Sequence, residues 1–171
     1  MALRAQSPVA PTVIGSDPAY RSPVQHDPQL AQALLDRYGY TKRDPDGFRR
    51  DPKGRPLTLV MHSEATVGGR LRDELWRKSL NSIGLRVEFR SDKKTEIIKA
   101  SRLGKVQMFE SNWFADFPDG ENFYQVLYGG NRGRSNYSRF NLPAYNLLYE
   151  QSRVLPDSPE RRRMYFEMNQ L

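Results

Sequence analysis

The sequence predicts an α/β fold, a single lobe whose parallel β-α-β-α-β core is flanked by further helices. Three short stretches have the apolar or alternating pattern of strands, at residues 57–61, 85–90 and 106–114. Two helical patterns lie between them, and connections of that length join parallel strands rather than hairpins. Such crossovers are right-handed almost without exception, so the order of the elements already restricts the topology.

The two crossover helices have recognisable faces and ends. The first pattern has one apolar face and stops at Gly84, because glycine readily adopts the left-handed conformation that ends many helices. The second pattern covers residues 93–103 and stops at Gly104. The apolar face of the first helix consists of Leu71, Leu75, Trp76, Leu80 and Ile83.

The segment before the core predicts a helix followed by two turns. Asp27 can cap a helix that begins at Pro28, since proline lacks the N–H that would be unpaired in the first turn. Gly39 can close this helix. The DPDG and DPKG tetrapeptides then place Asp, Pro and Gly as tight turns require.

The last third of the chain is helical in pattern. A short helix is expected over residues 121–128, and Asn141 is expected to cap a second helix. Ser158 precedes Pro159 and predicts the start of a final helix. That helix keeps its apolar spacing up to Leu171 with no stop signal, so we expect a truncated lobe.

The start of the chain has a different character. Residues 1–26 are rich in proline and serine and show no periodicity, so we expect an extended arm or linker there and the lobe over residues 27–171. No apolar run is long enough to span a membrane. Residues 1–11 lack the long apolar segment of a secretory signal.

The composition excludes some chemistry and leaves other chemistry open. The chain has 171 residues and no cysteine, which excludes disulfides, thiolate metal ligands and a cysteine nucleophile. Its formal net charge of +7 suits nucleic acid, but it also suits a solvated surface of mixed charge. The basic residues are spread among acidic ones, which favours the second explanation. The dense run 161–163 falls on a helical pattern, where a solvated face is expected.

The segment NWFADFPDGENFY, residues 112–124, carries the most chemical information. It follows the third predicted strand, and ligands of open parallel sheets bind at the carboxyl ends of the strands. A carboxylate between aromatic rings suits a cationic group such as an amine. The structural alternative is that Trp113 belongs to the core while Asp116 and Asp119 cap the next helix. Composition alone slightly favours this alternative.

Five segments match the landmarks of one protein family in the family's order. They are DPQLAQALLDRYGY, RDPDGFRRDPKGRPLTL, ELWRKSLNSIGLRVEF, NWFADFPDGENFY and NYSRFNLPAYNLLYEQ. Together they resemble the C-terminal lobe of the periplasmic solute-binding proteins of ABC transporters, in the oligopeptide/dipeptide/nickel-binding family (bacterial extracellular solute-binding protein family 5). Members of that family also have a first lobe, so the resemblance implies a chain truncated at both ends relative to its parent.

The resemblance implies one lobe of a type II periplasmic-binding-protein fold. Such a protein captures a peptide or similar small solute in a cleft between two lobes and delivers it to a membrane permease. The expected protein is periplasmic, is not an enzyme and needs no cofactor. In peptide-binding members an aspartate of the W-x-AD motif pairs with the ligand's α-amino group, and the tryptophan lines the pocket. These positions correspond to Asp116 and Trp113, with Asn112 and Phe114 as neighbours.

Two positions depart from the motifs of the family. Gly120 stands where proline is commoner, and Asn146 stands where aspartate is usual. Both lie outside the expected contact aspartate, so the fold prediction is unaffected. They leave the ligand class open, because some members carry nickel chelates, haem or sugars instead of peptides.

Two further functions remain as hypotheses. A basic nucleic-acid-binding α/β module would use the net charge and the aromatic and basic loop at residues 128–140. A small hydrolase would use Asp116 or Asp119 with a water, but no second catalytic group has a fixed place.

Other polar segments predict no site of their own. His62 and Glu64 follow the first strand without further metal ligands, so we expect an ordinary polar loop and no metal. The GGNRGRS segment predicts a flexible rim loop whose Arg132 or Arg134 could meet a ligand carboxylate. Arg139 is expected to form a structural salt bridge.

Overall fold

The computed structural model describes residues 5–171, so residues 1–4 of the predicted arm lie outside the described part. The chain divides into two compact units. The sheet unit consists of residues 25–111, and the described part of the helical unit consists of residues 5–24 and 112–171.

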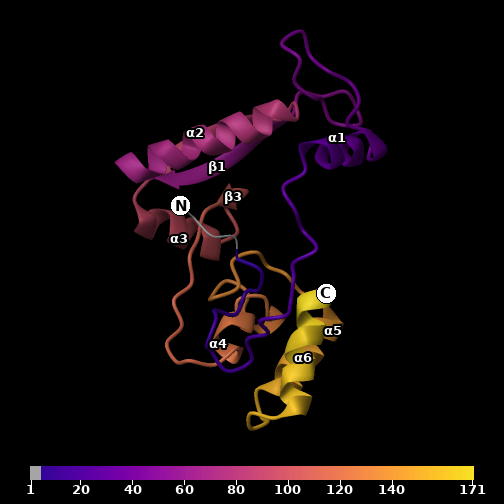
Figure 1. Cartoon of the computed structure of the whole chain (residues 1–171). Coiled ribbons are helices and arrows are strands. Elements are labelled where there is room, and N and C mark those ends of the chain that lie inside the picture. Colours follow the sequence, from indigo (N-terminus) through magenta and orange to yellow (C-terminus); the bar gives the residue numbers. More distant parts are fainter. Residues whose placement is uncertain (1–4) are drawn as a thin grey trace. The chain divides into compact units, whose positions relative to one another are not determined.

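A three-stranded parallel sheet forms the centre of the sheet unit (Figure 1). Its strands are β1 (Thr58–Glu64), β2 (Arg86–Asp92) and β3 (Met108–Phe109), in the order β2-β1-β3. β1 and β2 pair in parallel along their whole length. The predicted parallel core is therefore confirmed, although β3 is much shorter than the stretch 106–114 suggests.

Helices precede and connect these strands. α1 (Pro28–Arg37) begins where the sequence predicts, because the Asp27 carboxylate accepts a hydrogen bond from the Leu30 N–H at 2.8 Å. α2 (Val67–Ser82) connects β1 to β2, and α3 (Lys94–Arg102) connects β2 to β3. The strand and helix order of the prediction is thus found in the structure.

α2 turns an unexpected side inward. Its buried residues are Gly69 and Asp73, whereas Leu71 and Leu75 of the predicted apolar face are 65 % and 67 % exposed. Gly69 explains this orientation, because a Cβ atom there would lie 2.0 Å from the Glu64 carbonyl oxygen. Only glycine lets the helix approach the end of β1 so closely, and the leucines are left on the outer side.

A buried guanidinium ties the turn region of the sheet unit to its helices. Arg49 is 2 % exposed and donates to the carbonyl oxygens of Tyr40 at 2.6 Å and Ile83 at 2.9 Å. It also pairs with Asp36 of α1, with 2.5 Å between Nη1 and Oδ1. The turn that carries Arg49 is thereby fixed to the end of α1 and to the residue that follows α2.

We expect Arg49→Lys to lower the free energy of unfolding by about 1–3 kcal/mol. A lysine ammonium cannot reach the three acceptors that the planar guanidinium joins, so buried carbonyl oxygens would lose their donors. Urea unfolding followed by circular dichroism measures the loss. Arg55→Lys is the matched control, because Arg55 is largely exposed and pairs with Asp51 at the surface. Equal effects of the two substitutions would contradict this role.

The helical unit consists of short helices joined by loops. α4 (Glu121–Tyr124) and the 3-10 turn η1 (Gly129–Asn131) precede α5 (Pro143–Ser152) and α6 (Pro159–Gln170). α5 and α6 lie side by side (Figure 1). The predicted start of the last helix is confirmed, since the Ser158 hydroxyl accepts from the Arg161 N–H at 3.2 Å.

The segment before residue 25 packs into the helical unit. Residues 5–24 form no helix, yet Val9 is only 3 % exposed and belongs to the core. Ile14 joins the segment to the loop before α4, because its N–H donates to the Pro118 carbonyl and its carbonyl accepts from the Gly120 N–H at 2.8 Å. These residues therefore form part of the folded unit.

Tyrosines build much of the core of the helical unit. The rings of Tyr124 and Tyr165 stack at 4.8 Å between centroids, and those of Tyr128 and Tyr149 stack at 4.6 Å. Burying a phenol is favourable only when its hydroxyl finds an acceptor, and here each buried hydroxyl does. The hydroxyls of Tyr124, Tyr145, Tyr149 and Tyr165 donate to Asn169 Oδ1, the Tyr124 carbonyl, Glu121 Oε1 and Asp119 Oδ1.

A buried asparagine holds part of the loop between α4 and α5. Asn136 is fully buried, and its Nδ2 donates to the carbonyl oxygens of Tyr128 at 3.0 Å and Phe140 at 2.8 Å. These hydrogen bonds fix the residue that directly follows the GGNRGRS segment, residues 129–135, whose flexibility stays a prediction. An asparagine that bonds across a loop is not recognisable in the sequence, because its two acceptors are backbone atoms.

The predicted cap of α5 is wrong. The N-cap position is Leu142, and Pro143 is the first helical residue. The Asn141 side chain instead accepts a hydrogen bond from Asn146 Nδ2 at 2.8 Å, while Asn146 Oδ1 accepts from the Gly129 N–H at 2.8 Å. An amide at position 146 both donates and accepts here, which an aspartate could not do when ionised.

Candidate ligand site

The aromatic segment after residue 112 forms an open pocket within the helical unit. Its volume is 460 Å³, which suits a small molecule or a few residues of a peptide. Apolar side chains dominate the wall, and Asp116 is its charged member. The lining residues are Ala10, Val13, Trp113, Phe114, Ala115, Asp116, Phe117, Pro118 and Phe123.

Asn122 organises this wall from the buried side. It has no exposed surface, and its Oδ1 accepts from the Trp113 indole Nε1 at 2.8 Å and from the Asp116 N–H at 3.4 Å. An indole N–H can only donate, so the amide oxygen has to face it. The Asn122 Nδ2 then has no acceptor among the described residues. Asn122 thus fixes the indole and the backbone of Asp116 relative to each other.

Three of the four predicted site residues meet in this pocket. Trp113 is half-buried, whereas Phe114 and Asp116 are exposed. In the described part of the chain, no lysine, arginine or histidine nitrogen lies within 4.0 Å of the Asp116 carboxylate. Asn112 is exposed and is not part of the pocket wall. The arrangement leaves one carboxylate beside aromatic rings and open to a cation from solution.

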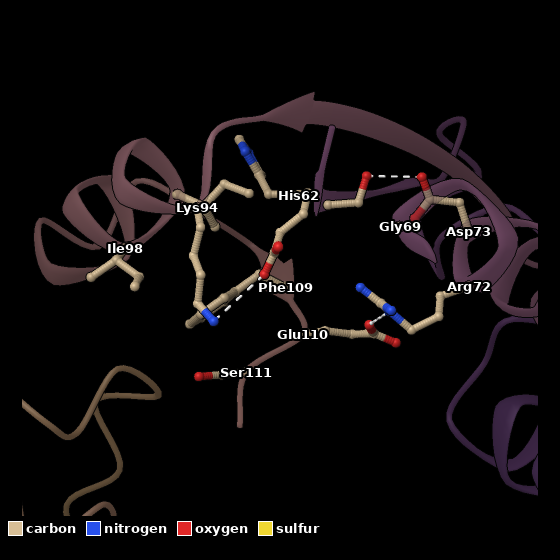
Figure 2. Close-up of a pocket in the computed structure, with 12 residues that line it drawn as sticks. His62, Gly69, Arg72, Asp73, Lys94, Ile98, Phe109, Glu110 and Ser111 are labelled. Atoms are coloured by element: carbon tan, nitrogen blue, oxygen red, sulfur yellow. Dashed lines mark hydrogen bonds and ion pairs between the residues drawn. The ribbon is translucent and has the colours of Figure 1, made fainter. Parts of the chain in front are cut away.

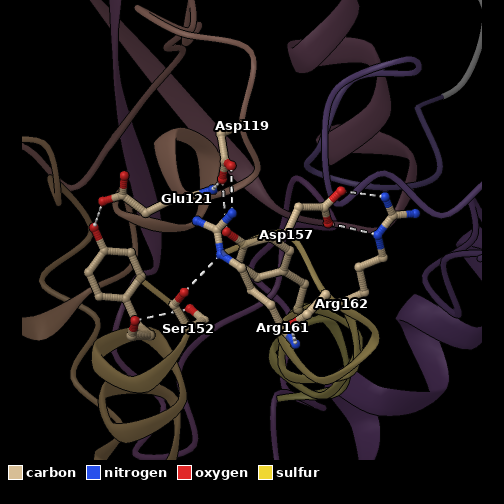
Figure 3. A network of polar contacts seen from close by, with 9 residues as sticks. Asp119, Glu121, Ser152, Asp157, Arg161 and Arg162 are labelled. Atoms are coloured by element: carbon tan, nitrogen blue, oxygen red, sulfur yellow. Dashed lines mark hydrogen bonds and ion pairs between the residues drawn. The ribbon is translucent and has the colours of Figure 1, made fainter. Parts of the chain in front are cut away.

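Asp119 stands three residues further on and has a structural environment (Figure 3). Its Oδ2 accepts from Arg161 Nη1 of α6 at 2.6 Å, and its Oδ1 accepts from the Tyr165 hydroxyl at 2.9 Å. The Arg161 Nε also donates to the Ser152 carbonyl oxygen of α5 at 2.8 Å. Because Arg161 is only 7 % exposed, this network holds the end of the pocket loop against both helices.

The same contacts set the ionisation of Asp119. Its partial burial raises the pKa, but the hydrogen bonds from Arg161, the Glu121 N–H and Tyr165 outweigh burial and hold the pKa below its ordinary value of 3.8. For Tyr165, burial and the hydrogen bond to Asp119 raise the pKa of the phenol. Asp119 is therefore ionised and Tyr165 neutral at physiological pH.

We expect the contribution of Asp119 to stability to depend on pH. A carboxyl with a lowered folded-state pKa stabilises the fold above its unfolded pKa of about 4 and loses this effect as the pH falls through the folded value. Asp119→Asn should therefore destabilise the protein at pH 7 by about 1–3 kcal/mol, with a smaller difference from wild type below pH 4.

Urea unfolding at a series of pH values, followed by circular dichroism, measures that difference. Asp157→Asn is the control, because hydrogen bonds from Arg162 also lower the pKa of Asp157 but its pair lies at the surface. A pH-independent gap between Asp119→Asn and wild type would contradict the assignment.

Gly120 also has a local explanation. A Cβ atom at this position would lie 2.8 Å from Tyr165 Cε2 and 3.2 Å from the Ile14 carbonyl oxygen. The Gly120 N–H donates to that same carbonyl at 2.8 Å, and a proline would have no such donor. The departure from the commoner proline thus follows from the packing of Tyr165 and residues near Ile14.

The ligand-binding and the structural interpretation of residues 112–124 each describe part of this segment. Asp119 does serve the next helix, since its Oδ1 accepts from the Glu121 N–H at 2.9 Å, whereas Asp116 caps no helix. Sequence reasoning missed Asn122, which was visible only as a member of the segment itself. It was wrong about Arg161, which is buried although it belongs to the basic run that predicts a solvated face.

The structure shows no metal site among residues 5–171, since no three His, Asp or Glu side chains are grouped to hold an ion. His62 and Glu64 line a separate small pocket in the sheet unit. Within the same described range, no helix is both long and apolar enough to cross a membrane.

A comparison with models of protein families gives the family of this chain. The family model described as "Bacterial extracellular solute-binding proteins, family 5 Middle" matches residues 1–135. The chain belongs to this family. The resemblance to this family is thereby confirmed, and four of the five segments lie within the matched residues. The basic nucleic-acid-binding interpretation has no support from the comparisons.

Related proteins match almost the whole chain. Di/tripeptide-binding protein 2 of Pseudomonas aeruginosa is 26 % identical over 168 residues, which are 96 % of this chain and 29 % of the relative. The periplasmic binding protein DppA from Helicobacter pylori, in complex with the peptide STSA, superposes with a TM-score of 0.78 at 23 % identity. The match covers 97 % of this chain and 30 % of DppA.

A protein that was solved with a bound metal chelate has the same fold. NikA from Brucella suis, in complex with Fe(III)-EDTA, superposes with a TM-score of 0.74 at 22 % identity, over 98 % of this chain and 34 % of NikA. The predicted α/β lobe of a type II periplasmic-binding-protein fold is confirmed by these structures. The chain spans about 30 % of the length of the relatives that it matches.

Proposed function

We propose that this chain is a solute-binding lobe of the substrate-binding component of an ABC importer. The observation that supports the proposal is the Asp116 carboxylate, which no cation of the described chain neutralises and which lies at the wall of an aromatic pocket. A protonated amine would bind there by charge-assisted hydrogen bonds, and the rings would exclude water and contact the cation. Membership of a family of solute-binding proteins supports the interpretation of this pocket as a solute site.

The four site residues take different roles in the proposal. Asp116 is the charge partner of the ligand amine, and Trp113 is a wall of fixed orientation because Asn122 holds its indole. Phe114 is 80 % exposed, so it can cover a ligand with apolar surface that is now in water. Asn112 is a neighbour of the pocket that could contact a longer ligand.

A peptide with a free amino terminus is the solute that fits these features best. The relatives include a protein named for di- and tripeptides and a structure with a bound peptide, whereas NikA holds a chelate that has no free amine. The departures at Gly120 and Asn146 do not argue against a peptide, because local packing and hydrogen bonding account for both.

The remaining parts of the function belong to a longer protein. In this proposal a first lobe closes over the pocket, the closed protein delivers the solute to the permease subunits, and the protein works in the periplasm. The role is binding without catalysis. Its support is the family, whose members are extracellular solute-binding proteins.

We expect Asp116→Asn, in a full-length protein that contains this chain, to weaken a dipeptide with a free amino terminus by about 10-fold to 150-fold. This range corresponds to the loss of a hydrogen bond to a charged group, about 1.5–3 kcal/mol. Titration calorimetry with the free and the N-acetylated dipeptide measures the effect. Asp157→Asn should change neither affinity, because Asp157 pairs with Arg162 outside the pocket. Unchanged affinity in Asp116→Asn would refute the assignment.

We also expect this chain alone to bind peptides weakly. One charge-assisted hydrogen bond contributes about 1.5–3 kcal/mol, and micromolar affinity requires about 8 kcal/mol. The other contacts of the ligand would come from the first lobe. Calorimetry on the 171-residue chain should show no micromolar binding of the same dipeptide. Micromolar affinity would contradict the two-lobe part of the proposal.

A further inference from the structure

A second, smaller pocket lies at the carboxyl end of the parallel sheet, within the sheet unit (Figure 2). Residues from the end of β1, the starts of α2 and α3, and the segment after β3 line it. Its volume of about 30 Å³ is enough for one group of the size of a water molecule. The carboxyl ends of parallel strands are where open α/β sheets bind ligands.

Two of the three carboxylates in the pocket wall already have cationic partners. Glu64 lies 3.7 Å from Lys94 Nζ. Glu110 accepts from Arg72 Nε at 2.5 Å and from the Trp76 indole at 2.6 Å. The formal charges of these two pairs cancel, so neither carboxylate needs a further cation.

The third carboxylate, Asp73 of α2, has no such partner. It is 6 % exposed, and its Oδ2 accepts a hydrogen bond from the Ser63 hydroxyl at 2.8 Å. No lysine, arginine or histidine nitrogen lies within 4.0 Å of it among residues 5–171. Figure 2 shows this carboxylate turned toward the pocket. A neutral hydroxyl only partly replaces the water that a buried carboxylate loses, so the pocket keeps one negative charge without a partner.

We propose that this pocket binds one primary ammonium group, such as the end of a lysine-like side chain of a solute. The volume admits such a group, and the Asp73 carboxylate with the Ser63 hydroxyl offers acceptors for its N–H donors. A metal ion fits less well, since the described residues group no three His, Asp or Glu side chains as ligands. The origin of the ammonium group in a solute rests on the proposed function, whereas its binding to the pocket does not.

The test is a titration of the 171-residue chain with methylammonium chloride, followed by ¹H–¹⁵N NMR. Parallel titrations at equal ionic strength use tetramethylammonium chloride, which carries no N–H, and potassium chloride. The expected result is a saturable shift of the amide signals of Ser63, Gly69 and Asp73 with methylammonium alone. Equal shifts with either of the other salts would overturn the proposal, because they would indicate charge screening rather than recognition of N–H donors.

A pair of variants isolates the carboxylate. Asp73→Asn keeps an oxygen that can accept from Ser63 but removes the charge, and it should weaken methylammonium about tenfold or more. Glu74→Gln removes a charge from the next residue of α2, where Glu74 pairs with Arg77 outside the pocket wall, and it should leave the affinity unchanged. Full affinity in Asp73→Asn would refute the site.

The stability of the variant separates a ligand-binding role from a structural one. If Asp73 serves to bind a ligand, then without ligand the Asp73→Asn variant should have the same free energy of unfolding as wild type or a higher one. The reason is that the substitution removes a buried carboxylate that has no cationic partner. A folded Asp73→Asn variant with a large loss of stability would overturn the proposal. If the variant does not fold, the comparison of the three salts on wild-type protein decides the matter. If Asp73→Asn bound methylammonium as tightly as wild type while Asp116→Asn still weakened the dipeptide, the ammonium site would be refuted and the proposed function would stand.

Discussion

The candidate ligand site depends on the ion pair between Asp119 and Arg161. The pair joins the end of an aromatic loop to the last helix of the helical unit, and Arg161 reaches α5 through the Ser152 carbonyl as well. Asn122 holds the other side of the loop by the Trp113 indole. The loop between these two fixed points exposes its side chains. The backbone of Asp116 is thereby oriented, while its carboxylate forms no ion pair within the described chain.

The contrast between Asp116 and Asp119 shows how strongly distant residues decide the role of a carboxylate. The two aspartates are separated by two residues and lie among the same aromatic neighbours in the sequence. Asp119 meets a guanidinium that is 42 residues away along the chain and becomes structural. Asp116 meets none in the described chain and remains available. Local sequence could propose both roles, but it could not assign them.

The same distinction separates what the sequence predicts from what it does not. The strand and helix order, the caps at Asp27 and Ser158 and the helix end at Gly84 follow from neighbouring residues, and all are found. The inward side of α2 depends on a clash between Gly69 and the Glu64 carbonyl, and the burial of Arg161 and Asn136 depends on partners brought together by folding. The family motifs point to Trp113, Phe114 and Asp116 of the pocket wall. The role of Asn122 could not be predicted, because it depends on hydrogen bonds from the Trp113 indole and the Asp116 N–H that only the folded structure shows.

The placement of the two tryptophans has a practical consequence for spectroscopy. Trp76 belongs to the sheet unit and donates to Glu110, whereas Trp113 belongs to the helical unit and donates to Asn122. Because the chain has only these two indoles, replacing either one with phenylalanine leaves a single emitter that reports on one unit alone. In the variant that keeps Trp113, quenching of the emission would register a ligand at the aromatic wall, and the variant that keeps Trp76 would report on the sheet unit alone.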